Sequence, residues 1–325
     1  MLRRSSGPLR LARRAFSSAS TLVGVEVSAL QGLMVAQGHA SRDPAVREGL
    51  HPLVVPLAST AAGDVLGLLR WPPKSGEVSV VKTRAQGPGD VAADSLSLHP
   101  CGTPVQYARR AAVEADVAVD GTRDATTVIS AAAEAAVEGG GDAYGAGDVE
   151  ASRLSLEHFL LVRVGPFTDV WEGVARGKLA KGDETAALVA AERASSLNPG
   201  WGCCGYLQSQ ICGLLGRTEE QRDLALGALE APFWTLGVPV ADALAAAQLS
   251  HVDDLRGLVR AMEDKVREQQ NAAPRTAAEL AFLRLTDALD DVVRLHGRWD
   301  DSRPIVAGAL REAGFEDAAR IADVL

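Results

Sequence analysis

The sequence is poor in aromatic residues and lacks any long apolar run. Aromatic side chains make up only 4% of its 325 residues. No stretch of about 20 continuous apolar residues occurs, which argues against a membrane-spanning helix. The apolar fraction of 47% and the charged fraction of 23% are ordinary for a globular protein, so most of the chain can bury a core. Alanine is abundant and favours helices because it loses no side-chain entropy there.

Cysteine and histidine are also scarce, and no catalytic signature is present. The four cysteines, Cys101, Cys203, Cys204 and Cys212, form no C-x-x-C pair, which predicts reduced thiols. Adjacent Cys203 and Cys204 are interpreted as helix packing. No zinc-protease or G-x-S-x-G motif occurs. His99 and Cys101 form the most metal-like pair, but two ligands do not make a site unless another cysteine approaches. We therefore expect no metal and no cofactor.

The first residues have the composition of a targeting segment. Five arginines precede residue 15, and the first acidic residue is Glu26. A basic, serine-bearing, acid-free start is typical of organellar transit peptides. The run from Arg14 to Ser17 resembles a mitochondrial processing pattern, which predicts cleavage between Phe16 and Ser17. We expect import into the mitochondrion, into the matrix, with the chloroplast stroma as the alternative.

Cleavage would make the chain strongly acidic. The whole sequence carries a net charge of −9, and removal of five arginines leaves 28 basic residues against 42 acidic ones, a net charge of −14. Binding to a phosphate backbone requires clustered lysine and arginine. The sequence therefore predicts no DNA binding and makes RNA an unfavoured partner.

Turn signals and periodicity divide the chain into five parts. Short β-branched runs between residues 50 and 100 predict two or three strands. Thr103, Pro104 and Gln106 are a helix-start signal for residues 103–119. Glycines at 139–147 indicate a linker, since no strand or Lys-Ser/Thr makes them a phosphate loop. Ten further helices are predicted after it, including helices near 150–163 and 252–270. The expected organisation is a transit peptide (1–16), a poorly defined segment (17–50), a small α+β domain (51–138), a linker (139–149) and a helical domain (150–325).

One stretch of the helical part has a recognisable repeat pattern. Trp171, Ala175, Gly182 and Pro199 stand at the aromatic, small-residue, turn and closing positions of a 34-residue unit, with alanines at 187, 191 and 194. Gly216 and Ala228 recur 34 residues after Gly182 and Ala194, whereas Gln221 departs from the alanine pattern. Residues 168–234 thus resemble tetratricopeptide repeats. The fold class that we expect is mainly α, a tetratricopeptide-like array of helical hairpins behind a small α+β region.

The phrase from Trp171 to Gly177 also resembles proteins of plant and algal organelles, which implies no activity. Seven of the fourteen aromatic residues lie between Phe159 and Trp234. They indicate either a packing core or a partner-binding groove. For the groove, the candidate partner-binding residues are Trp171, Lys178, Trp201, Tyr206 and Trp234.

We expect a non-enzymatic scaffold, assembly factor or accessory subunit that binds protein partners in a mitochondrial complex. The motivation is the repeat resemblance together with the lack of a catalytic constellation. Two alternatives remain open. One is an enzyme with a site between the N-terminal region and the helices, using His99, Cys101, Arg109 and Arg110. The other is an organellar RNA-binding helical repeat.

Overall fold

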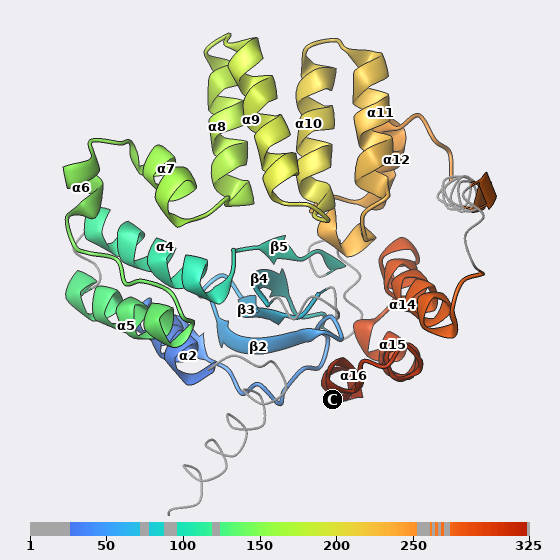
Figure 1. Ribbon diagram of the computed structural model, residues 1–325, viewed down its shortest axis with the longest axis horizontal. Helices are drawn as coiled ribbons and strands as arrows, with labels where there is room; N and C mark the ends of the chain where they lie inside the picture. The colour runs from blue at the N-terminus through green and yellow to red at the C-terminus, as the bar shows by residue number, and fades with distance from the viewer. Residues whose placement is uncertain are drawn as a thin grey trace, which may run out of the picture.

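The computed structural model describes residues 27–71, 78–87, 96–118, 124–251, 261, 264–265, 268–269 and 274–323. It is mainly helical, with one antiparallel sheet in its N-terminal half (Figure 1). The expected transit peptide, its cleavage site at Phe16 and Ser17, and most of the expected helix at 252–270 lie outside the described residues.

The sheet has five antiparallel strands in sequence order. They are β1 (Ala40–Ser41), β2 (Val54–Ser59), β3 (Asp64–Leu69), β4 (Ser79–Arg84) and β5 (His99–Pro100). A side chain would not fit at Gly67 in β3, because a Cβ there would lie 2.7 Å from the carbonyl oxygen of Val55. Gly67 lies beside an irregularity in the β2–β3 register. The sequence predicted a small sheet here but too few strands, since β1 and β5 are only two residues long.

Both faces of the sheet are covered. Alternate residues of a strand point to opposite faces. Thus Val55 and Leu68 pack into one core with helices α2 (Val27–Ala36), α4 (Pro104–Val117) and α5 (Ala125–Glu138). Val54 and Leu69 pack into a second core with α14 (Ala277–Arg294), α15 (Trp299–Glu312) and α16 (Glu316–Asp323). Figure 1 shows these two helix groups on either side of the strands.

Local signals explain the helices of the first core. The side chain of Thr103 accepts a hydrogen bond from the backbone N–H of Gln106, and the Gln106 side chain accepts one from Thr103 in return, which confirms the predicted start of α4. The segment at 17–50, expected to be poorly defined, contains α2. Its Leu33 and Met34 are fully buried, and Gln31 donates hydrogen bonds to the carbonyls of Arg42 and Leu57.

Two helical hairpins form the repeat region. They consist of α8 (Thr168–Ala180) with α9 (Glu184–Leu197), and α10 (Gly202–Leu214) with α11 (Thr218–Leu229). Gly182 and Gly216 both have positive φ values, 75° and 74°, in the turns between paired helices. The hydrogen bond from Asp183 N–H to the Lys178 carbonyl recurs 34 residues later, from Arg217 to Cys212. The helical hairpins predicted for this region are thereby confirmed.

The departure at Gln221 has a physical reason. Its amide lies against Gly213 of the facing helix, where a Cβ would be only 2.6 Å from Nε2. In the first hairpin the equivalent residues are Leu179 and Ala187, a large residue on the first helix and a small one on the second. The second hairpin exchanges the two sizes, so the interhelical space stays filled.

The chain between the sheet region and the hairpins differs from the expected single helix at 150–163. It forms α6 (Asp148–Ser152), α7 (Leu156–Phe159) and a π-helical turn, η1 (Leu160–Val164). Arg153 adopts a positive φ of 57° and Ser155 caps α7, so the helix is interrupted there. Tyr144 and Val149 are buried in the same core as α4 and α5. The stretch at 139–149 therefore contributes to packing as well as connecting elements.

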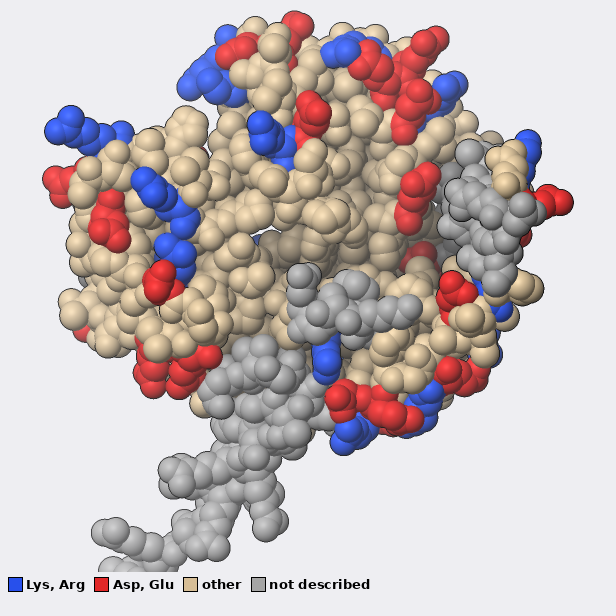
Figure 2. Space-filling model, viewed as in Figure 1, with Lys and Arg blue, Asp and Glu red and all other residues tan. Residues whose placement is uncertain are grey.

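Acidic and basic side chains are interspersed over the face shown in Figure 2. Among the described residues, no helix is both long enough and apolar enough to cross a membrane.

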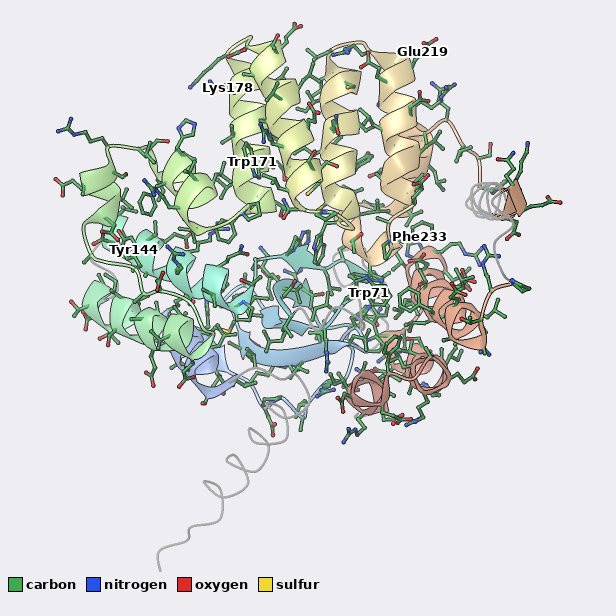
Figure 3. The ribbon with its side chains drawn as sticks, viewed as in Figure 1. Trp71, Tyr144, Trp171, Lys178, Glu219 and Phe233 are labelled. Atoms are coloured by element: carbon green, nitrogen blue, oxygen red, sulfur yellow. The ribbon has the colours of Figure 1, made fainter. Side chains whose placement is uncertain are left out.

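Aromatic side chains join the hairpins to the sheet and to the C-terminal helices. Trp234, in the short helix η2 (Phe233–Thr235), lies 5.5 Å from Trp71 and 6.1 Å from Trp201, between ring centroids. His51 packs between Trp234 and Trp299 at 4.8 Å and 4.7 Å. Figure 3 labels Trp71 and Phe233, which pack into the same core, in the region where the hairpins meet the sheet. Four of the five tryptophans therefore form one cluster.

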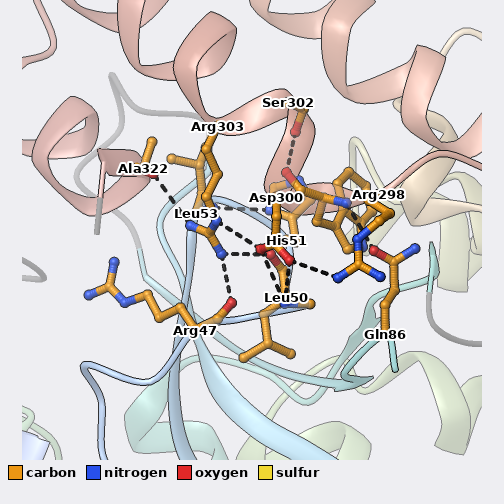
Figure 4. A network of polar contacts seen from close by, with 12 residues as sticks. Arg47, Leu50, His51, Leu53, Gln86, Arg298, Asp300, Ser302, Arg303 and Ala322 are labelled. Atoms are coloured by element: carbon orange, nitrogen blue, oxygen red, sulfur yellow. Dashed lines mark hydrogen bonds and ion pairs between the residues drawn. The ribbon is translucent and has the colours of Figure 1, made fainter. Parts of the chain in front are cut away.

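A buried polar network fastens α15 and α16 to the loop before β2 (Figure 4). Arg303 pairs with Asp300 at 3.2 Å and donates hydrogen bonds to the carbonyls of Arg47 and Leu50 at 2.7 Å and 2.9 Å. Arg47 donates to the carbonyl of Ile321. Burial, with the nearby charge of Arg303, lowers the pKa of Arg47 to about 10 and that of His51 to about 3, so His51 is neutral at ordinary pH.

Candidate functional site

A cleft of about 510 Å³ lies between the N-terminal sheet region and the two helical hairpins. Its lower wall comes from β5 and one face of α4, and its upper wall from α8 and α10, the first helix of each hairpin. Figure 2 shows the surface hollowed at the centre of this face, below the hairpins. A cleft of this size is in the range of ligand pockets.

Helical spacing explains which side chains face the cleft. On α4, Tyr107, Arg110, Ala111 and Glu114 line it, a spacing of three and four residues that keeps them on one face. On α8 and α10 the lining positions recur at the repeat period. Asp169, Glu172 and Arg176 of α8 correspond to Cys203, Tyr206 and Gln210 of α10. The guanidinium of Arg176 donates a hydrogen bond to the side chain of Gln210 at 2.8 Å. This bond links the same position of the two repeats.

Arg110 connects the two walls. It binds both carboxylate oxygens of Asp169 on α8 at 2.8 Å and 2.7 Å, and Glu114 on its own helix at 2.7 Å. Its guanidinium also lies 4.8 Å above the ring of Phe167. Burial disfavours both charges, but the hydrogen bonds and mutual attraction prevail. The pKa of Arg110 is raised and that of Asp169 is lowered. Bidentate pairs of this kind fix orientation as well as adding energy.

Charge in the cleft is balanced. Lys82, Arg110 and Arg176 face the acidic residues Glu114, Asp169 and Glu172. The continuous basic stripe that an RNA-binding groove requires is therefore not found among the described residues that line the cleft.

Thiols from both walls also face the cleft. Cys101 follows β5, whereas Cys203 and Cys204 lie in the first turn of α10, with their sulfur atoms 4.0 Å apart. Burial raises the pKa of the Cys101 thiol to about 11, so it remains protonated. His99 lines the same cleft. The structure thus brings the metal-like pair His99 and Cys101 toward two other cysteines. Within the described part of the chain, however, no three His, Cys, Asp or Glu side chains are arranged to hold a metal ion.

The candidate partner-binding residues lie in different parts of the structure. Tyr206 lines the cleft, although its side chain is mostly buried. Trp234 is only 1% exposed and belongs to the aromatic cluster with Trp201. Trp171 packs beside the buried alanines of the first hairpin. Lys178 is exposed near the far end of α8, 3.9 Å from Asp183 (Figure 3).

Sequence reasoning missed Asp169, Glu172 and Arg176 as cleft residues. The signal that could have found them is the 34-residue offset from Cys203, Tyr206 and Gln210. Arg110 was a candidate of the enzyme alternative and lines the cleft, whereas its neighbour Arg109 does not.

Comparison with known protein families gives two matches, one for each side of this cleft. The family described as PAB N-terminal matches residues 17–163, and the family described as PAB middle domain matches residues 168–253. The chain is thus similar to PAB proteins in two regions, which are called the PAB N-terminal domain and the PAB middle domain below. The walls of the cleft therefore belong to different domains, with β5 and α4 from the PAB N-terminal domain and α8 and α10 from the PAB middle domain. The tetratricopeptide-like residues 168–234 lie within the middle domain.

A curated relative extends the similarity beyond these domains. The chain is 27% identical over 288 residues to the Arabidopsis thaliana protein called "Protein IN CHLOROPLAST ATPASE BIOGENESIS, chloroplastic". The aligned region covers 87% of this chain and 81% of the Arabidopsis protein. No solved structure shows a significant match to the chain.

The pair formed by Arg110 and Asp169 joins the two PAB domains, and its strength is measurable. We expect Arg110→Gln and Asp169→Asn each to lower the free energy of unfolding by roughly 1–2 kcal/mol. The coupling energy in a double-mutant cycle should be about 1 kcal/mol, because Asp169 is half exposed and solvent weakens the pair. Urea unfolding at low and high salt measures both, and salt should reduce the coupling.

A matched control is the pair Arg217 and Glu220, which lies within α11 and its cap and is exposed on both sides. Its coupling energy should be clearly smaller than that of Arg110 and Asp169, because solvent screens both partners. Arg217 also binds both carboxylate oxygens of Glu220, so equal coupling in the two pairs would show that the partly buried position between the domains adds nothing.

Proposed function

We propose that this chain is an organellar assembly factor for the chloroplast ATPase. The observation that supports this most is the alignment with the Arabidopsis relative, which is named for chloroplast ATPase biogenesis and aligns over 87% of this chain. Both PAB domains lie within the chain, so the similarity is not limited to one repeat region. This proposal keeps the assembly role expected from the sequence and changes the complex.

The proposed compartment is the chloroplast, which the sequence offered as the alternative to the mitochondrion. The relative's name supports the chloroplast and lends no support to the mitochondrion. A fluorescent protein fused to the C-terminus of the full chain tests this in cells. Overlap with chlorophyll fluorescence is the expected result, and overlap with a mitochondrial dye would return the protein to our first expectation.

We further propose that the cleft holds a segment of an ATPase subunit during assembly. Its walls offer tyrosines, amide groups and paired charges, notably Tyr107, Tyr206 and Gln210. Such groups suit a polypeptide, whose backbone both donates and accepts hydrogen bonds. A site between two domains can also release its occupant when the domains move, as an assembly factor must.

The direct test is loss of the gene followed by complementation. Without this chain, the assembled chloroplast ATPase in a blue-native separation should fall several-fold, while the other photosynthetic complexes remain. Affinity purification of the tagged chain from chloroplasts should recover ATPase subunits. Normal ATPase levels in the mutant would refute the proposed role.

Two variants on one helix test the cleft itself. Gln210→Trp should fill the cleft and fail to restore the ATPase. Gln208→Trp lies on another face of α10, against α11, and should restore it. Equal rescue by both folded variants would separate the assembly role from the cleft.

A second candidate is an enzyme that uses the same cleft. The observation that favours it is the convergence of His99, Cys101 and Arg110 from the sequence alternative. Two features weigh against it: carboxylates already bind Arg110, and the raised pKa of Cys101 disfavours a nucleophilic thiolate. Native mass spectrometry of the protein purified from chloroplasts would detect a bound small molecule if this candidate were correct.

A further inference from the structure

Three of the four cysteines line the cleft, yet only one has the surroundings of a reactive thiol. Cys101 is kept protonated by burial, as described above, and Cys204 is only 2% exposed. Cys212 lies at the other end of α10, where it is also buried and does not line this cleft. Cys203 is partly exposed and faces the cleft.

The position of Cys203 in α10 favours a negative charge. Trp201 is the N-cap of this 13-residue helix, so Cys203 is its second residue. Backbone N–H groups in the first turn lack partners within the helix and form the positive end of its dipole. Thiolates at helix N-termini are stabilised for this reason.

A neighbouring thiol adds a donor to this site. The sulfur of Cys204 lies 4.0 Å from that of Cys203, on the buried side. Either thiol can donate while both are protonated, but once Cys203 is ionised only Cys204 carries a proton, so the contact favours the Cys203 thiolate and lowers its pKa. Glu172 on α8 opposes a thiolate, but it is bound to Arg176 at 2.7 Å. The imidazole of His99 from β5 is also near, because a Cβ on Gly237 would lie 3.4 Å from the Cβ of Cys203 and 3.6 Å from the His99 ring.

We propose that Cys203 is a modification site at which the protein forms a mixed disulfide with a low-molecular-weight disulfide of the glutathione type. After the Cys203 thiol gives its proton to water, its sulfur attacks one sulfur of the small disulfide. A new S–S bond forms to Cys203 and the original S–S bond breaks. The departing thiolate keeps the electron pair and takes a proton from water, so one sulfur of the small disulfide is reduced to a thiol as Cys203 is oxidised.

Cys204 does not displace the added group. Adjacent Cα atoms in a trans peptide are about 3.8 Å apart, whereas disulfides usually join Cα atoms roughly 4.4–6.8 Å apart. A bond between Cys203 and Cys204 would therefore distort the first turn of α10. The mixed disulfide persists until an external thiol reduces it.

The cleft can accommodate the added group. Its volume of about 510 Å³ is open to solvent and is lined by Lys82, whose charge suits a carboxylate of glutathione. A peptide-sized adduct at Cys203 occupies the space between the two PAB domains. This inference concerns the purified chain and does not depend on the proposed assembly role.

The test uses the reduced full-length protein incubated with glutathione disulfide at pH 7, with each cysteine followed by peptide mass spectrometry. Cys203 should acquire glutathione at least about tenfold faster than each other cysteine, since rate follows thiolate content and access. Cys204→Ala should slow this reaction several-fold at pH 7 and restore it at pH 9, where the thiolate forms without its donor.

Cys212→Ala is the matched control on the same helix and should leave the rate at Cys203 unchanged. Circular dichroism before the reaction verifies that each variant is folded. The proposal is overturned if Cys203 reacts no faster than Cys101 or Cys212, or if the folded Cys204→Ala variant reacts like the wild type at pH 7. Recovery of a Cys203–Cys204 disulfide in place of the adduct would overturn it as well.

Discussion

Replacing Arg303 with methionine is expected to lower the free energy of unfolding by about 3–5 kcal/mol. Arg303 is only 3% exposed and lies where α15 and α16 meet the loop before β2. Urea unfolding followed by far-ultraviolet circular dichroism measures the change.

The large effect follows from the groups that the guanidinium leaves behind. In the native protein it hydrogen-bonds the carbonyls of Arg47 and Leu50 and pairs with Asp300. A methionine fills a similar volume but donates no hydrogen bond, so buried carbonyls lose their partner at about 1–3 kcal/mol each. In the variant Asp300 still pairs with Arg298 at 3.2 Å and still accepts a hydrogen bond from the backbone N–H of Gly49. These contacts limit the loss of stability.

The matched control is Arg320→Met on α16. Arg320 also pairs with an acidic residue, Asp317, but its side chain is 61% exposed. Its replacement should change stability by less than about 1 kcal/mol. If both variants have the same small effect, the buried network does not hold the C-terminal helices to the sheet. Since the PAB matches end at residue 253, this result also tests whether the chain beyond them stabilises the PAB N-terminal domain.

Replacing Trp234 with alanine is expected to cost about 3–5 kcal/mol, the range for large aromatic side chains deleted from a core. Trp234 is 1% exposed and contacts His51, Trp71 and Trp201. Its removal opens a cavity where the hairpins, the sheet and the C-terminal helices meet.

Trp234→Phe tests how much of this loss depends on the volume of the side chain. The indole N–H of Trp234 has no hydrogen-bond partner among the described residues, so phenylalanine loses only volume and should cost less than alanine. Leu214→Ala, at a side chain that is 67% exposed, should stay within about 0.5 kcal/mol of the wild type. A Trp234→Ala loss below about 1 kcal/mol would mean that the cluster contributes little to stability.

Features decided by local interactions were predictable from the sequence. The capping box at Thr103 and Gln106 depends on residues three apart, and the turn glycines Gly182 and Gly216 satisfy a local need for positive φ. The hairpins follow from periodicity within about 34 residues. In contrast, residues 23–35 were predicted only as either a strand or a short helix, and α2 is the helix. Their apolar residues do not gather on one side, so periodicity did not distinguish the two.

Only the tertiary structure showed which helices and strands contact one another. The cleft combines β5, α4, α8 and α10, and its central ion pair joins residues 59 positions apart. The buried contact between Arg303 and Leu50 spans 253 positions. The sequence by itself determined the helical hairpins, the small sheet and the supply of thiols and charges. Long-range packing determined which of them face one another, because apolar faces and buried charges find their partners only when the whole chain is folded.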